Sequence, residues 1–344
     1  QVTIMGDRFF SKIQYGKEPT RGTAVAATRM LIGAQVSAIS PDKRPRKIPE
    51  NIGVRSAGHR KVIDQYLVSD SLSIPEGYFQ ALPLPFGCGM KGGVTPTETT
   101  PSQQDYKWDF TPSLAFNTLN NPDSVTLEKG DNTQAFECEY TMFQRIRISG
   151  RVAQGAEGAP VAIEAEFFAR QWSPVSFTAG LSLPTATPMN AKLARLYLDT
   201  TWAGLGTTEI ANALRAFDID IMLGARPDFS GSAAKTFNKH GEGIIGAQVA
   251  VTLEGLTAAD AIWDSYHSDT QALGFLQLLL SGPQIGTGVN HSLKVNVSGR
   301  WDEVIPLAEE DRGNNLHTCL FTSDYDPTSA KEVGVEVVTN QNTY

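Results

Sequence analysis

The chain of 344 residues is 41% hydrophobic, 9% aromatic and 19% charged, which is ordinary for a folded protein and excludes global disorder. Its 29 Lys and Arg against 37 Asp and Glu give a formal net charge of -8, so a broadly basic surface that grips nucleic-acid phosphates is not expected. At about 100–200 residues per domain, the length predicts two domains or one large all-β body, and we favour two domains.

Apolar runs such as 275–280 fall far short of the ~18 residues that a membrane helix needs, and the opening QVTIMGDRFFSK has no apolar signal core. We therefore expect a soluble protein that is not obviously exported. Three cysteines, Cys88, Cys138 and Cys319, are too few and too far apart for a disulfide framework. They indicate folding in a reducing cytosol, with each thiol a small, buried, unreactive group.

Short alternating segments separated by Gly and Pro dominate the chain, which has 31 Gly and 19 Pro and therefore favours many strands over long helices. In the best of them, Val161, Ile163, Ala165 and Phe167 alternate with Glu164, Glu166 and Phe168. Because successive strand residues point to opposite faces, this segment predicts a core face and a mostly solvated face. The predicted strands are, in chain order, 106–110, 144–149, 161–168, 195–198, 217–223, 248–254, 292–297 and 332–338.

Helical signals are few. The segment 257–268 is the clearest, because Thr257 can cap it and Ala258, Ile262 and Tyr266 recur at four-residue spacing. A second helix is predicted to start within 73–79 and to be cut short by the prolines that follow.

The Pro-rich, weakly charged stretch 173–190 predicts a boundary near residue 180, which gives domains 1–180 and 181–344. Two long connections, 87–104 and 224–243, exceed the usual length, and loops of this kind are commonly functional or ordered by a partner. We interpret the glycine-rich start of the first connection, 87–93, as a flexible loop.

No motif for catalysis is present. The pattern GxGxxG occurs at 241–246, but a polar loop precedes it and a strand follows it, the reverse of a dinucleotide site. The five histidines are scattered without metal-ligand spacing. Carboxylate pairs such as Asp218 and Asp220 could serve acid–base or metal chemistry, although a solvated strand face is the simpler interpretation. We expect no catalytic, cofactor-binding or metal site, no cofactor, and no enzyme.

The opening segment 13–29, IQYGKEPTRGTAVAATR, carries the most specific pattern in the chain: a glycine step, a glutamate, then TRGTAVA. It resembles the start of tail tube proteins (major tail proteins) of long-tailed, siphovirus-type bacteriophages. The resemblance continues at lower density through 75–82, 106–110 and 318–340.

The resemblance implies a structural virion protein, mainly β, with two tandem tail-tube domains of β-barrel or β-sandwich type, each with a short flanking helix. Such subunits form stacked rings around a channel that delivers DNA into the host cell. A chain with two such domains implies three copies per ring with pseudo-sixfold symmetry, rather than hexamers. The implied partners are further copies of the chain and the tape measure, tail terminator and baseplate proteins, with DNA passing through the lumen without specific binding and no membrane. The implied location is the virion tail tube, after folding and assembly in the bacterial host cytoplasm.

Charge predicts where copies meet. The segment 41–65 has a local charge of about +4, and prolines at four-residue spacing keep it from forming a helix. We expect an extended N-terminal arm or loop that contacts a neighbouring subunit through Lys43, Arg44, Arg46 and Lys47. The natural partner is the acidic C-terminal stretch with Glu309, Glu310, Asp311, Asp324 and Asp326. A solvated basic loop without a partner remains open.

A net acidic or neutral channel wall is expected from the charge of the whole chain, and Asp218 and Asp220 are the candidate lumen residues. The alternative function is a carbohydrate-binding or host-adhesion β-sandwich module. In that case tryptophans would supply the stacking platforms. The candidates are Trp108, Trp172, Trp202, Trp263 and Trp301.

Overall fold

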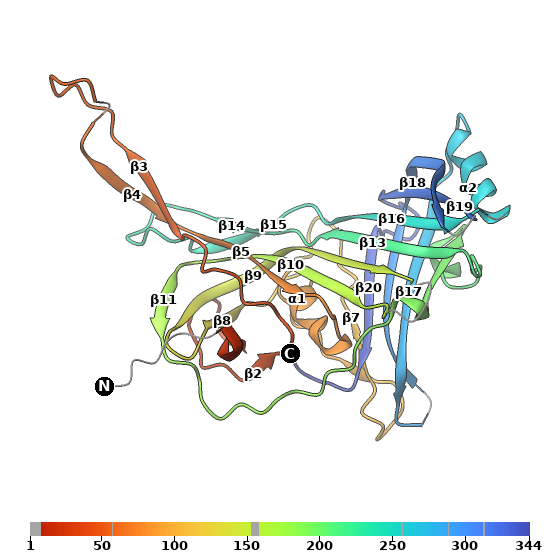
Figure 1. The fold of residues 1–344 in the computed structure, drawn as a ribbon, viewed down its shortest axis with the longest axis horizontal. Helices are drawn as coiled ribbons and strands as arrows, with labels where there is room; N and C mark the ends of the chain where they lie inside the picture. Colours follow the sequence, from red (N-terminus) through yellow and green to blue (C-terminus); the bar gives the residue numbers. More distant parts are fainter. Residues whose placement is uncertain (1–7, 57, 153–157, 256, 288, 312–313) are drawn as a thin grey trace.

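The computed structural model describes residues 8–344 except 57, 153–157, 256, 288 and 312–313 (Figure 1). The chain is mainly β, which confirms the fold class expected from the alternating segments. The strands are β1 (Lys12–Lys17), β2 (Arg29–Leu31), β3 (Lys43–Lys47), β4 (Lys61–Tyr66), β5 (Val68–Ile74), β6 (Thr97–Glu98), β7 (Tyr106–Asp109), β8 (Val125–Gly130), β9 (Ala135–Arg151), β10 (Val161–Ala169), β11 (Trp172–Val175), β12 (Ala194–Asp199), β13 (Leu214–Met222), β14 (Ala225–Asp228), β15 (Lys239–Glu242), β16 (Gly246–Glu254), β17 (Gly274–Ile285), β18 (Val289–Asp311), β19 (Asn314–Ser323) and β20 (Val333–Thr339). The α-helices are α1 (Pro83–Gly87) and α2 (Thr257–His267), and the short 3-10 helices are η1 (Arg8–Phe10), η2 (Phe79–Ala81), η3 (Ala191–Leu193) and η4 (Trp202–Gly204).

One large antiparallel sheet organises the molecule. Within the described residues it joins sixteen strands along the path β2-β1-β8-β9-β13-β16-β19-β18-β20-β7-β6, with β5, β10, β11, β12 and β17 as branches. Strands from the two sides of residue 180 pair directly, since β9 pairs with β13 and β7 pairs with β20. The two halves of the sequence therefore share a continuous hydrogen-bonded sheet.

The core lies on one side of this sheet because the strands keep their alternation in register. Ile163 is paired with Ile148, which is paired with Ile219, and Val249 continues the same row on β16. Each of these side chains is at most 3% exposed. The main cluster of buried side chains runs from Ile13 to the C-terminal strand, so both halves contribute to one core. Burial on this scale is the main stabilising contribution to such a fold.

Helix α2 forms where the sequence predicts it, with Ile262 buried and Tyr266 packed against the core. The second predicted helix does not start at Ser73, because Ile74 ends β5 in register with Ile163, and only the short 3-10 helix η2 begins within the predicted range, at Phe79. Helix α1 starts at Pro83 and contains both prolines that were expected to cut the helix short. Proline is tolerated there because the first helical turn leaves its N–H groups without intrahelical partners.

The first four residues of the glycine-rich segment 87–93 are packed into the interior, contrary to the expected flexible loop, while Gly93 at its end is exposed. Cys88 and Met90 are fully buried, and a Cβ at Gly87 would collide with the hydroxyl of Tyr344. All three cysteines are free and buried, as the sequence predicts. The tight packing explains the glycines at 87, 89 and 92, where an added Cβ would collide with neighbouring atoms.

Two hairpins leave the large sheet. The β3–β4 hairpin, here called the arm with its connecting residues (43–66), projects from one end of the molecule, at the opposite end from α2 (Figure 1). The β14–β15 hairpin occupies most of the long connection 224–243. No helix in the described ranges is long and apolar enough to span a bilayer.

Candidate functional site

The solvent side of the sheet from β5 through β10, β9, β13, β16 and β19 to β18 is here called the polar face. Its residues lie in register across the strands: Glu164 is paired with Arg147, Arg147 with Asp220, and Asp220 with Gln248. Each of these side chains is partly or fully exposed, while their sequence neighbours point into the core. The polar face comprises Ser71, Ser73, Arg145, Arg147, Ser149, Glu164, Glu166, Asp218, Asp220, Gln248, Ala250, Thr252, Thr318, Leu320, Thr322 and Arg300.

Arginines of β9 are bound by carboxylates of β13 on this face. Arg147 Nε donates to Asp218 Oδ1 at 2.8 Å, and Arg145 Nε donates to Asp220 Oδ1 at 2.7 Å. In both pairs a terminal guanidinium nitrogen also donates to the second carboxylate oxygen. Arg145 Nη1 donates in addition to Glu166 Oε1 at 3.3 Å on β10. These hydrogen bonds, aided by the opposite charges, raise the pKa of both guanidinium groups.

These pairs shape the surface charge more than the stability. The side chains of Arg145 and Arg147 are 45% and 52% exposed, and exposed ion pairs contribute only about 0–1 kcal/mol. The bidentate geometry, however, uses the donors with which a guanidinium would bind a phosphate. The ladder of two arginines between four carboxylates is therefore slightly acidic and its cations are already neutralised.

Both sequence-predicted lumen residues, Asp218 and Asp220, lie side by side on this polar face. Sequence reasoning missed their partners Arg145 and Arg147, although the signal was present in the alternation of 144–149 with Ile146 and Ile148 inside. The pairing of β9 with β13 bridges distant segments, and nothing local in the sequence specifies it.

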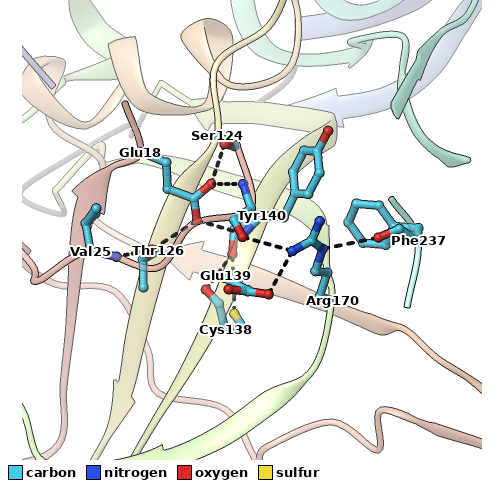
Figure 2. A network of polar contacts seen from close by, with 11 residues as sticks. Glu18, Val25, Ser124, Thr126, Cys138, Glu139, Tyr140, Arg170 and Phe237 are labelled. Atoms are coloured by element: carbon cyan, nitrogen blue, oxygen red, sulfur yellow. Dashed lines mark hydrogen bonds and ion pairs between the residues drawn. The ribbon is translucent and has the colours of Figure 1, made fainter. Parts of the chain in front are cut away.

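A buried carboxylate organises the opening motif (Figure 2). Glu18 is 4% exposed and accepts hydrogen bonds from Ser124 Oγ at 2.5 Å, Thr126 Oγ1 at 3.0 Å and the Tyr140 backbone N–H at 2.8 Å. It also accepts from the N–H of Gly22 at 2.8 Å, where φ is +73°. The turn that follows Glu18 is thereby fixed, and a charge-assisted network of this kind is among the stronger polar interactions.

Arg170 closes the same network from the other side. Its Nη1 donates to the carbonyl of Gly22 and to Glu139 Oε1, both at 2.9 Å, and its Nε donates to the carbonyl of Phe237. The guanidinium also lies 5.0 Å from the ring centre of Tyr140 (Figure 2). The residues of the opening motif therefore hold the N-terminal loop against β8, β9 and β10.

The basic arm residues are exposed. Lys43, Arg44, Arg46 and Lys47 all lie on β3, whose five residues are exposed. Arg46 is paired with Asp64 across the hairpin at 2.7 Å. The remaining cations give the arm a positive surface.

The acidic C-terminal residues are not equivalent. Asp326 is 5% exposed and accepts hydrogen bonds from the N–H groups of Thr328 and Ser329 and from the Ser329 hydroxyl. Asp324 is paired with Arg300 at 2.6 Å. Asp311 ends β18, and the side chains of Glu309 and Glu310 lie outside the described part of the chain. At least Asp326 is thus occupied within its own turn.

The tryptophans proposed as stacking platforms are unevenly placed. Trp108 and Trp301 are 2% and 6% exposed and pack in the core. Trp172, Trp202 and Trp263 are half-buried, and Trp172 lies 5.8 Å from the buried ammonium of Lys129. Two of the five are therefore inaccessible to a sugar in this conformation.

Neither a protein-family model nor a curated protein sequence matches this chain.

Proposed function

We propose that this chain is a tail tube protein of a siphovirus-type bacteriophage, which polymerises into stacked rings that conduct DNA. The observation that carries the proposal is the polar face, a one-sided sheet that crosses both halves of the chain and exposes charges already paired with one another. The opening motif at 13–29 supports the same assignment through its resemblance.

The polar face is the candidate channel wall. A protein that neutralises phosphates with free Lys or Arg gains affinity by releasing counterions, which would hold DNA in place. Arg145 and Arg147 instead bind Asp220 and Asp218, so the wall repels DNA weakly and offers few adhesive cations. Such a surface suits a conduit through which DNA must slide.

Two tandem tail-tube domains, 1–180 and 181–344, would place six domains in a ring of three chains. Closed rings need head-to-tail contacts that close by rotation, and two similar domains per chain provide a pseudo-sixfold arrangement. The partners at the tube ends are then the tape measure, terminator and baseplate proteins that the resemblance implies.

Electron microscopy of the concentrated protein tests the proposal. We expect rings or tubes whose averaged images show threefold symmetry. A dispersed monomer that binds on a glycan array would instead support the adhesion module, and a true sixfold ring with one tube domain per chain would refute the duplication.

The arm supplies a second test. Reversal of its four β3 cations to Glu should leave the monomer folded and slow tube growth at low salt, because complementary charges orient docking. A matched control reverses four exposed cations outside the arm and should assemble at the wild-type rate. The arm residues are Lys43, Arg44, Arg46 and Lys47, and the control residues are Lys192, Arg195, Arg226 and Lys239.

A further inference from the structure

A groove of about 520 Å³, lined by both polar and apolar groups, lies beside the polar face, between the loop 113–120 and the residues that connect β15 to β16. Its lining carries unusually exposed large side chains: Phe116 is 105% exposed, Leu119 68%, Ile244 84% and Tyr325 50%. Single exposed apolar residues are ordinary, but a group of this size in one depression is typical of an interaction site.

The groove is also acidic. Glu242 and Glu332 line it, and both carboxylates hydrogen-bond to neutral groups: Glu242 to the N–H groups of Asn120 and Asn121, and Glu332 to the hydroxyl of Ser323. Their negative charges therefore remain uncompensated by these contacts. The fitting partner is a segment with apolar side chains and basic flanks.

The arm of this same chain has that chemistry. Near its tip Ile52 is 39% exposed and Val54 is 64% exposed, followed by the exposed Arg55. The strands below the tip carry further exposed cations. An isolated two-stranded hairpin is at best marginally stable in water, so contact with another surface would stabilise the arm.

We infer that the groove receives the arm tip of a second copy of this chain, with Ile52 and Val54 against the apolar lining and Arg55 near Glu242 and Glu332. This inference rests on the proposed self-assembly and identifies the surface that the arm binds. It differs from docking on the acidic stretch 309–326 alone, in which Asp326 is already occupied.

Cross-linking between copies tests the contact. One preparation carries Val54→Cys and a second carries Ile244→Cys, both in the full-length chain, and the two are mixed at low salt with a short bismaleimide. Because the three native cysteines are fully buried, the introduced thiols are the reactive ones. We expect a product of twice the 37.2 kDa chain mass, at least five-fold more abundant than when Leu183→Cys, also exposed, replaces Ile244→Cys.

The cross-linking result and the electron-microscopy result together distinguish the failure of this inference from the failure of the proposed function. Tubes without the specific cross-link would overturn the inference and leave the proposed function standing. The cross-link without rings or tubes would support the contact and refute the tube. Absence of both would refute both.

A substitution in the groove tests the same contact through the rate of tube elongation. Phe116→Ser changes a fully exposed side chain, so the monomer should keep its melting temperature while tube elongation slows at least ten-fold. The matched control, Leu183→Ser, should elongate at the wild-type rate. Equal rates for the two variants and the wild type would overturn the inference.

Discussion

A buried ion pair anchors the base of the arm. Lys129 on β8 is fully buried and its Nζ lies 2.8 Å from Asp70 Oδ2 on β5, whose side chain is 10% exposed. Nζ also donates to Ser37 Oγ at 2.7 Å and to the carbonyl of Ala38 at 3.3 Å. The chain that leads into the arm is thereby tied to the core through Lys129.

The magnitude follows from burial and distance. At 2.8 Å and an effective dielectric constant of about 20, Coulomb attraction is about 6 kcal/mol, most of which offsets the desolvation of the two charges. Removing one partner leaves the other buried and uncompensated, which costs about 3–5 kcal/mol. Lys129→Met and Asp70→Asn should each lose about this much free energy of unfolding.

The double variant separates the pair from its surroundings. In Lys129→Met combined with Asp70→Asn neither charge remains, and the Asn oxygen can still accept from the N–H of Ser71, as Asp70 does at 2.8 Å. We expect the double variant to lose at least about 2 kcal/mol less than the sum of the single losses.

Urea unfolding followed by circular dichroism gives the four free energies. If the loss in the double variant equals the sum of the two single losses within about 0.5 kcal/mol, the two charges do not stabilise each other, which refutes the argument. Amide exchange at 37–42 should increase in both single variants if the pair also anchors the arm.

Three further outcomes follow from the structure. The double variant Asp218→Asn with Asp220→Asn should free the β9 guanidinium groups, so that tubes retain more DNA in a salt-sensitive way, as measured by filter binding. Unchanged DNA retention would contradict the proposal that the polar face is the channel wall. His291 is 5% exposed and its burial lowers its pKa below the ordinary ~6.5, so its proton uptake favours the unfolded state as the pH falls from 7 to 5. The melting temperature should fall more in the wild type than in His291→Gln. Tyr344→Phe removes a 2.6 Å hydrogen bond to Asp123 and should cost about 1–3 kcal/mol in urea unfolding, with no loss contradicting its role.

The sequence predicts the strands better than their partners. Alternation in 161–168 gives the correct strand and the correct direction of each side chain, because side-chain direction is a local property. Phe167 lies in the main core as predicted, and Phe168 points to the opposite face, which a second small cluster with Tyr140 and Phe237 covers at this end of the strand. The covering residues come from distant segments of the chain, so nothing local in 161–168 signals that Phe168 is buried.

For the candidate site, too, the sequence predicts the direction of side chains on one strand but not the neighbouring strand. Carboxylates at 218 and 220 are predictable as one face of one strand, and that prediction is all that period-two spacing allows. Their neutralisation by Arg145 and Arg147 depends on β9 lying beside β13, a pairing of residues about 70 positions apart. The buried role of Glu18 is likewise not apparent from its neighbours in the sequence, because three of its hydrogen-bond donors come from Ser124, just before β8, from β8 and from β9.

The order of strands explains why arginines occur on a surface that we propose to be non-adhesive. Like charges directly opposite each other on adjacent strands destabilise a sheet. Strand β9, with Arg145 and Arg147, lies between β10 with Glu164 and Glu166 and β13 with its two aspartates. The arginines therefore separate two acidic strands that would otherwise repel each other, while the excess of carboxylates keeps the face slightly negative. The same ladder of charges would therefore serve both the pairing of these strands and the proposed function, because each arginine between the acidic strands is bound by a carboxylate and would not be free to bind a DNA phosphate.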